Sequence, residues 1–385
     1  MLAQIREITL MNLQNLPSRL GSSSVIVVGI AGVVAVLVGL LAMGAGFTQA
    51  LESTGKADRA IVMQTGTTSE LNGNIGAADR AIISAMEGID IASGELFVVA
   101  AIDKKGADIT ANVVVRGVEP ASFAIRPELQ IVEGRNFEPG RAEVIVGVRA
   151  ASQFVGLDVG SVLPVRDQSW TVVGHFTAQG TSIESELWAD LANVQSAYRR
   201  GGTANSLRVR LDSPEAAFSL NERLQNDPRF DLEVRTEQDH YAEQARERAE
   251  LINGFGFAVG IIMAIGAVFA ALNTMYSAVS ARTVEIATLR ALGFGNIPVV
   301  VSVMIEALVL ALAGGLIGGA LVWLVFDGYT ASTLNGFSQV GFDFAVTADL
   351  LQMGLTWAVL LGLVGGLFPA LRAARLPITT ALRGE

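Results

Sequence analysis

Four long stretches of this sequence are almost free of charged residues, and they limit what the chain can fold into. Asp, Glu, Lys and Arg are absent from residues 20–51, 251–281 and 350–371, and residues 291–326 contain a single one, Glu306. A helix needs about 20 apolar residues to cross the hydrocarbon core of a bilayer. We therefore expect an α-helical membrane protein with four transmembrane helices. They should occupy residues 24–46, 251–280, 297–326 and 350–371.

The positions of the basic residues predict how the chain is oriented. Cytoplasmic loops of membrane proteins are enriched in Lys and Arg. The terminal segments and the segment between the second and third spans contain Arg6, Arg19, Arg282, Arg290, Arg372, Arg375 and Arg383. Residues 327–349 contain no Lys or Arg and should form a short external loop. We expect the cytoplasmic side to hold an amphipathic helix at 1–23, a helix at 281–296 and a tail at 372–385.

Residues 47–250 should form one large external domain. This segment holds 20 of the 27 Lys and Arg residues and 30 of the 37 Asp and Glu residues, so it carries the whole formal net charge of -10. Short segments rich in Val and Ile predict strands. They lie at 95–102, 111–118, 142–148, 169–176, 206–211 and 231–236. Because helical segments lie between some of these strands, we expect an α+β domain of two lobes.

The end of the external domain predicts one long helix. No proline occurs between Thr236 and Ala281, and Thr236 followed by acidic residues is typical of a helix start. About 45 residues at 1.5 Å each give a helix roughly 67 Å long, of which a bilayer takes only about 30 Å. We expect the remainder to stand outside the membrane as a rigid stalk.

The composition excludes several kinds of chemistry. The chain contains no cysteine, so disulfides and thiolate metal sites are impossible. His175 and His240, the two histidines, lie far apart and predict no metal centre. No phosphate-binding loop of the form G-x-x-x-x-G-K-[ST] occurs, so we expect this chain to bind no ATP and no other cofactor, and to be no enzyme. Its acidic external domain argues against nucleic acid as a partner.

Two features inside the spans concern helix packing. The third and fourth spans contain glycines four residues apart, a spacing that lets membrane helices approach closely. They are Gly314, Gly315, Gly318, Gly319, Gly362 and Gly366. An unpaired charge in a span costs on the order of 3 kcal/mol, so Glu306 must face protein, water or a partner, or be protonated. Two interpretations stay open for Glu306: a contact for a proton or substrate, and a buried ion pair or hydrogen bond that steadies helix packing.

The segment 281–296 predicts a docking helix. On a helix, Ile286, Leu289 and either Leu292 or Gly293 share one stripe. Arg282, Glu285 and Arg290 surround this stripe with charge. We expect the helix to present a small apolar ridge with charged flanks to a soluble protein in the cytoplasm. A surface turn without a partner is the alternative.

The same segment carries a resemblance to a known family. "RTVEIATLRALGFGN" at 282–296, "EALVLALAGGLIGG" at 306–319 and the ending "GLFPALRAARLPITTALRGE" resemble the FtsX-like permease domain of MacB-type ABC transporters. The external segments "RGVEPASF", "IVEGRNF", "AEVIVGVRAASQF", "VGSVLPV" and "WTVVGHF" are similar to successive landmarks of the MacB periplasmic core domain, which has a porter-like lobe and a second lobe. Together these motifs cover nearly the whole chain.

The resemblance implies a permease of the bacterial inner membrane, with its large domain in the periplasm and a second permease copy as partner. It also implies that residues 281–296 are the coupling helix that seats on an ABC ATPase. The coupling residues are Arg282, Glu285, Ile286, Leu289, Arg290 and Leu292. Glu306 matches the family glutamate of the third span. Pro369, Arg372, Arg375 and Leu382 match the C-terminal motif.

The resemblance further implies the partners. The ATPase that MacB carries at its N-terminus has no counterpart here, as in DevC-like and LolC/LolE-like permeases, so ATP and Mg should be bound by two copies of a separate ATPase subunit. Such permeases are thought to transmit force to the periplasm. We expect export with a periplasmic membrane-fusion adaptor and a TolC-like outer-membrane channel. Lipoprotein release and FtsX-like regulation of a cell-wall hydrolase are the alternatives.

Overall fold

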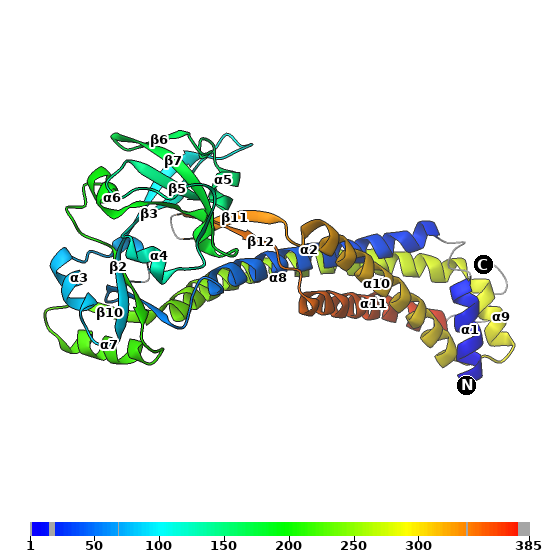
Figure 1. Cartoon of the computed structure of the whole chain (residues 1–385). Coiled ribbons are helices and arrows are strands. Elements are labelled where there is room, and N and C mark those ends of the chain that lie inside the picture. The colour runs from blue at the N-terminus through cyan, green and yellow to red at the C-terminus, as the bar shows by residue number, and fades with distance from the viewer. Residues whose placement is uncertain (1, 15–19, 68, 336–337, 376–385) are drawn as a thin grey trace. The chain divides into compact units, whose positions relative to one another are not determined.

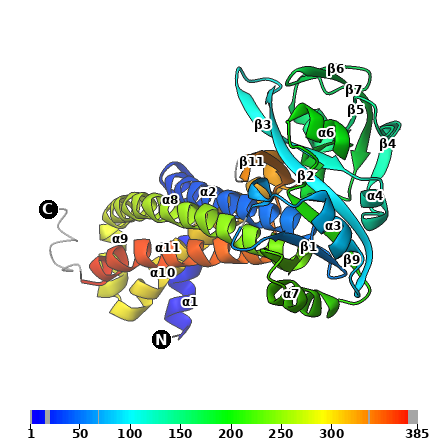
Figure 2. The ribbon, with the colours of Figure 1, turned by 90° about the vertical axis from the view of Figure 1, so that its left-hand side faces the viewer.

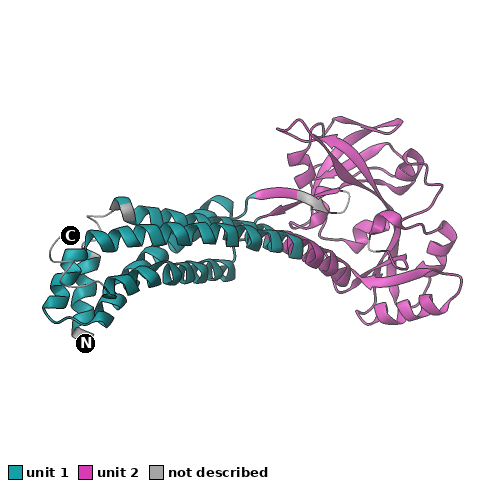
Figure 3. Cartoon of the chain, turned by 180° about the vertical axis from the view of Figure 1, so that it is seen from behind, with its two compact units in different colours: residues 1–45, 250–329, 344–385 teal, residues 46–249, 330–343 magenta. Residues whose placement is uncertain are grey.

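The structure, a computed structural model, describes residues 2–14, 20–67, 69–335 and 338–375. The chain divides into two compact units, which Figure 3 distinguishes by colour. We call residues 1–45, 250–329 and 344–385 the helical unit. Residues 46–249 and 330–343 form the sheet unit. The predicted fold class, membrane helices with an external α+β domain, is confirmed.

Four long helices account for the charge-free stretches of the sequence. They are α2 (Leu20–Glu52), α8 (Glu237–Ala281), α10 (Asn296–Phe326) and α11 (Ala348–Arg375). Among the described residues, these are the helices that are long and apolar enough to cross a membrane. In the described part of the helical unit, two short helices, α1 (Leu2–Gln14) and α9 (Thr283–Ala291), accompany them (Figure 1).

Helix α8 runs without interruption for 45 residues, as its proline-free sequence predicts. The hydroxyl of Thr236 accepts a hydrogen bond from the backbone N–H of Asp239 at 3.0 Å. This is the predicted N-terminal cap, which satisfies one of the amide groups that the first turn leaves free. Gly254 and Gly256 lie inside α8 and do not break it.

Within the described residues, the sheet unit is built on one ten-stranded sheet in the order β10-β1-β9-β2-β3-β8-β5-β7-β4, with β6 paired to β7. The strands are β1 (Arg59–Gln64), β2 (Ile89–Asp103), β3 (Thr110–Val118), β4 (Gln130–Gly134), β5 (Glu143–Gly147), β6 (Val162–Val165), β7 (Gln168–Thr177), β8 (Leu187–Asp190), β9 (Ser206–Leu211) and β10 (Leu232–Thr236). The six predicted strands are present as β2, β3, β5, β7, β9 and β10. The sequence analysis missed the others, which are mostly shorter.

Each end of this sheet has its own apolar core, which gives the unit two lobes. In the first lobe, β1, β9 and β10 pack against α3 (Ala77–Ser84) and α7 (Ala216–Asn226), as Figure 2 shows. In the second lobe, β3, β5, β7 and β8 pack against α5 (Val148–Gln153) and α6 (Leu191–Ala197). Helix α4 (Ala121–Ile125) follows β3.

The predicted loop at 327–349 is folded, which corrects the sequence analysis. It contains a hairpin of β11 (Thr330–Asn335) and β12 (Ser338–Asp343), and this hairpin belongs to the sheet unit. Among the strands that the structure describes, β11 and β12 pair only with each other, and side chains of the sheet unit bind the hairpin. Those contacts come from residues more than 140 positions away, so no local pattern revealed them.

Candidate functional site

Helix α9 lies in the segment for which a docking helix was predicted, and one of its faces is buried. The residue before it, Arg282, leaves helical geometry with φ -108° and ψ 15°, and so separates α8 from α9. Ile286 is buried in the apolar core of the helical unit. Val284 is 55% exposed and Leu292 is 73% exposed.

This arrangement corrects the expected apolar ridge. Ile286 was predicted to face a partner, but it packs inward, and Leu289 is half-buried beside it. The apolar side chains that α9 and its C-terminal cap leave exposed are Val284 and Leu292. Helical periodicity identifies a stripe correctly, but it does not say which side of a helix the neighbouring helices will cover.

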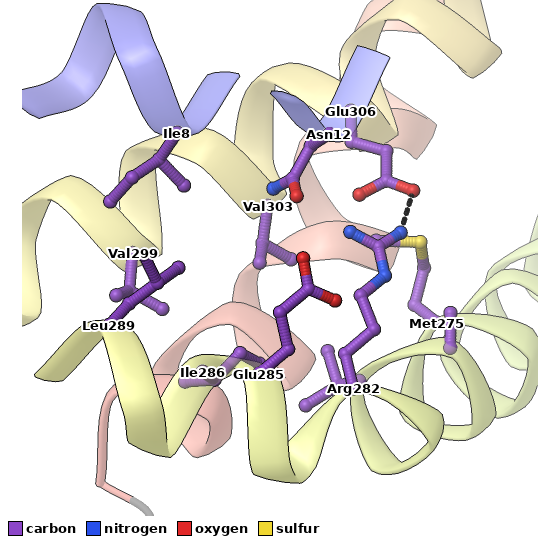
Figure 4. A pocket seen from close by; sticks show the side chains of 12 residues that line it. Ile8, Asn12, Met275, Arg282, Glu285, Ile286, Leu289, Val299, Val303 and Glu306 are labelled. Atoms are coloured by element: carbon purple, nitrogen blue, oxygen red, sulfur yellow. Dashed lines mark hydrogen bonds and ion pairs between the residues drawn. The ribbon is translucent and has the colours of Figure 1, made fainter. Parts of the chain in front are cut away.

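Arg282 and Glu306 form a buried ion pair. One guanidinium nitrogen of Arg282, Nη2, lies 2.5 Å from Glu306 Oε1, and each side chain is only 6% exposed. Figure 4 shows the two groups facing each other between α10 and the junction of α8 with α9. A charge in a membrane helix needs a partner of this kind because burial without one is strongly unfavourable. Of the two interpretations left open for Glu306, the structure shows the ion pair.

Helix α1 covers the same junction. Asn12 Nδ2 donates a hydrogen bond to Ser302 Oγ on α10 at 2.5 Å, and Ile8 is buried. A cavity of about 20 Å³ remains between α1, α9 and α10, lined in part by Glu285 and Leu289 (Figure 4). This volume holds about one water molecule. The junction is therefore closely packed, and α1 takes part in it.

The predicted glycines lie where helices approach one another. A Cβ atom placed on Gly314 would lie 2.8 Å from the carbonyl oxygen of Val27 on α2, and one on Gly315 would lie 2.7 Å from Ala358 Cβ on α11. The remaining glycines are similarly close to a neighbouring helix: Gly318 to Ala31, Gly319 to Leu351, Gly362 to Ala311 and Gly366 to Ala307. Larger side chains would push these helices apart.

The C-terminal motif is only partly described. Pro369 is buried inside α11, and the guanidinium of Arg372 lies 5.4 Å from the ring centroid of Tyr276 on α8. Arg375 is the exposed last residue of α11. Leu382 lies outside the described residues. Arg290 is half-buried in the last turn of α9.

A buried network of charges in the sheet unit was missed by the sequence analysis. Arg116 bonds Glu186, Glu95 and Glu70 at 2.7 to 3.0 Å. Arg208 bonds Glu70 at 3.0 Å. The other members of the network are Arg59, Arg126, Glu128 and Glu237. Arginine within the Val-rich segments of β3 and β9 was the only sequence signal for it.

The network shifts the protonation of its own members. Burial alone would raise the pKa of Glu70, but the guanidinium groups of Arg116 and Arg208 outweigh burial and lower the pKa to about 2. Burial acts on Glu95 in the same way, and Arg126, Arg208 and Arg116 together hold its pKa far below the ordinary value. Both carboxylates therefore stay charged at neutral pH.

The network borders a cavity of about 320 Å³ in the sheet unit. Arg116 and Phe97 line it side by side, and the guanidinium is 5.0 Å from the ring centroid. Tyr241 and Gln244 of α8 and residues 338–340 of β12 also line the cavity. The volume is within the range of sites for small organic molecules.

Comparison with known proteins identifies the family. Residues 23–227 match the MacB-like periplasmic core domain, and residues 257–378 match the FtsX-like permease C-terminal domain. The chain belongs to the MacB/FtsX-like family of ABC transporter permeases. As a MacB/FtsX-like permease, it is a multi-pass inner-membrane protein with a periplasmic domain, and that domain is the sheet unit.

Individual relatives agree with this family. The macrolide export ATP-binding/permease protein MacB of Bdellovibrio bacteriovorus is 23% identical over 97% of this chain and 61% of its own length. The pyoverdine export ATP-binding/permease protein PvdT of Pseudomonas entomophila is 26% identical over 66% of this chain and 40% of its own length. The chain thus spans less than two thirds of both relatives. The periplasmic region of MacB from Actinobacillus actinomycetemcomitans is a similar solved structure, with 16% identity, a TM-score of 0.38, and coverage of 47% of this chain and 90% of that one.

Proposed function

We propose that this permease couples ATP hydrolysis on a separate cytoplasmic ATPase to movement of its periplasmic domain, and so drives export of a periplasmic or membrane-embedded substrate. ATP and Mg²⁺ are bound by the ATPase, because these 385 residues contain no phosphate-binding loop. In this proposal α9 lies on the cytoplasmic side, with α1 and residues 372–385.

The observation that carries the proposal is the construction of α9. Its outward face presents Val284 and Leu292, which suit a shallow apolar socket on a soluble partner. Its inward side is joined to α10 by the pair of Arg282 with Glu306. Pressure on the exposed face therefore reaches two membrane helices, α8 directly along the chain and α10 through the ion pair.

Membership of this family supports the other partners that we propose. Two copies of the permease bind two ATPase subunits, and a periplasmic membrane-fusion adaptor and a TolC-like outer-membrane channel complete the export path. The names of PvdT and MacB describe export by those proteins. Helix α8 suits force transmission because it is continuous for 45 residues, whereas a flexible linker would absorb displacement.

Reconstitution tests the coupling. The permease and its candidate ATPase are placed together in lipid nanodiscs, and the rate of ATP hydrolysis is measured. We expect the wild-type permease to change this rate severalfold and Leu292→Glu to abolish the change. Glu222→Gln, at an exposed position of α7, is the matched control and should behave as wild type. Equal rates of ATP hydrolysis with and without the wild-type permease would contradict the proposal.

A comparison of cells tests export itself. Strains with an active and an inactive partner ATPase are compared for small molecules in the medium, for lipoproteins in the inner membrane and for cell-wall fragments. Loss of a small molecule from the medium supports export. Retained lipoproteins alone would instead indicate lipoprotein release, and altered wall fragments alone would indicate regulation of a hydrolase.

A further inference from the structure

The sheet unit holds α8 at a defined place in the first lobe. Glu237, the first residue of α8, is 1% exposed and accepts a hydrogen bond from Arg208 of β9 at 2.8 Å. Arg59 of β1 and Arg126 each lie 4.0 Å from the same carboxylate. A displacement of α8 along its axis would therefore act first on β1 and β9.

The β11–β12 hairpin is held by a different part of the sheet unit. Arg149 of α5 forms an ion pair with Asp343 at 2.7 Å and donates a hydrogen bond to the carbonyl of Gly341. The hydroxyl of Ser185 accepts a hydrogen bond from the Gly341 N–H at 2.8 Å. Lys104 Nζ donates to Ser332 Oγ at 2.9 Å. Arg149 and Ser185 belong to the second lobe.

Apolar packing reinforces the attachment of the hairpin. Phe342 of β12 is fully buried, and its ring meets that of Phe47 edge-on at a centroid distance of 5.6 Å. An edge-to-face pair of this kind adds to the stabilisation from burial. The hairpin is thus fixed by charge, by hydrogen bonds and by an aromatic contact, which is more than a passive connection between α10 and α11 needs.

Helix α8 and the hairpin, which these two attachments hold, both line one cavity. The first turns of α8 contribute Tyr241 and Gln244 to the cavity of about 320 Å³, and β12 contributes residues 338–340. Arg116 and Glu186 of the buried network line the same cavity. A change in the separation of α8 and the hairpin would alter the width of this cavity directly.

We propose that the β11–β12 hairpin is a second mechanical attachment, through which α10 and α11 move the second lobe independently of α8 and change the width of the cavity. The hairpin stays bound to the second lobe throughout the ATP cycle. This inference rests on the proposed function, because it needs nucleotide-driven movement of the membrane helices. It adds a named route from the third and fourth spans to the periplasmic domain.

The test weakens the attachment and then restores it covalently. Lys104→Gln with Asp343→Asn removes the charge from two polar contacts of the hairpin and so weakens them. Lys105→Gln with Asp158→Asn makes the same changes in a solvent-exposed pair of the same lobe and is the matched control. A Cβ at Gly341 would lie 3.2 Å from Ser185 Oγ, so Ser185→Cys with Gly341→Cys can form a disulfide. The chain has no other cysteine.

The readout is hydrogen exchange of the β7 backbone in the permease–ATPase complex, with and without ATP and vanadate. We expect the wild type and the control to show an ATP-dependent change in exchange. The variant with Lys104→Gln and Asp343→Asn should lose at least half of this ATP-dependent change while its thermal stability stays the same. When the oxidised Ser185→Cys, Gly341→Cys disulfide is added to that variant, the ATP-dependent change should return. If the weakened variant kept the full ATP-dependent change in exchange, the hairpin would not be a mechanical attachment. The same conclusion would follow if the disulfide blocked that change. No change in the wild type would overturn the proposed function itself.

Discussion

Arg282 Nη2 and Glu306 Oε1 lie 2.5 Å apart in the interior of the helical unit, between the start of α9 and the third turn of α10. The pair joins the junction of α8 and α9 to the membrane helix α10. Removal of one member leaves the other buried and unpaired, which costs about 3 to 5 kcal/mol. The pair therefore stabilises the helical unit, and in the proposed function it also transmits force from α9 to α10.

Glu306→Gln should lower both the thermal stability of the permease and the change that it causes in ATP hydrolysis. The reversed pair, Arg282→Glu with Glu306→Arg, should recover part of the stability and part of the effect on ATP hydrolysis. It restores the attraction between the two positions with their charges exchanged. Differential scanning fluorimetry and ATPase assays in nanodiscs measure the two effects. A reversed pair no better than Glu306→Gln would show that charge pairing is not what matters here.

The two faces of α9 should respond differently to substitution. Val284→Glu should prevent ATPase binding and leave stability almost unchanged, because the side chain is exposed. Ile286→Ala should destabilise the permease by about 2 to 4 kcal/mol, because the side chain is buried. Co-purification and thermal unfolding distinguish these results. Equal loss of stability in both variants would mean that the assignment of faces is wrong.

Close helix contacts predict which glycines tolerate a methyl group. Gly318→Ala should destabilise the permease by about 1 to 3 kcal/mol, because the added Cβ meets the backbone of Ala31 on α2. Gly29→Ala, on α2, is the matched control: its Cβ meets nothing within 4 Å, and alanine favours the helix. Thermal unfolding in detergent compares them. A harmless Gly318→Ala would argue against the packing of α2 on α10.

The buried network predicts loss of stability in acid. The pKa of Glu70 falls from its ordinary value of 4.5 to about 2 on folding, so the folded state binds fewer protons than the unfolded state. The stabilisation is complete above pH 4.5 and is lost as the pH falls towards 2. It amounts to roughly 3 kcal/mol, from about 1.4 kcal/mol for each unit of pKa.

Chemical unfolding of the whole permease between pH 3 and 7, followed by tryptophan fluorescence, measures this contribution to stability. The free energy of unfolding should change little from pH 7 to pH 5 and fall below that. In Glu70→Gln the acid limb should be shallower, whereas Glu222→Gln should keep the wild-type profile. If the free energy of unfolding fell as steeply below pH 5 in Glu70→Gln as in the wild type, other carboxylates would be responsible for the loss of stability in acid.

The sequence predicts the elements whose signals are local. The spans follow from long runs without charge, and β2, β3 and β9 follow from clusters of Val and Ile. Helix α8 follows from the cap at Thr236 and the absence of proline. Each of these patterns lies within one continuous segment of the chain, so it can be read without knowing the fold.

The remaining features depend on contacts between distant residues. The hairpin is held by Arg149 and Ser185, which no local pattern connects to β12. Whether Arg208 is buried or exposed depends on Glu70 and Glu237, which come from other elements. The inward orientation of Ile286 depends on α1 and α10. For these residues, the sequence indicates a residue type and the fold decides its role.

Site-specific crosslinking at Leu292 tests the central claim most directly. Because the chain contains no cysteine, Leu292→Cys provides a single thiol for a reagent that carries a photoreactive group. In membranes that contain the complex, we predict a crosslink from residue 292 to the ATPase and none from Phe218→Cys, which is exposed on the periplasmic domain. A crosslink from residue 218 and none from residue 292 would contradict the account.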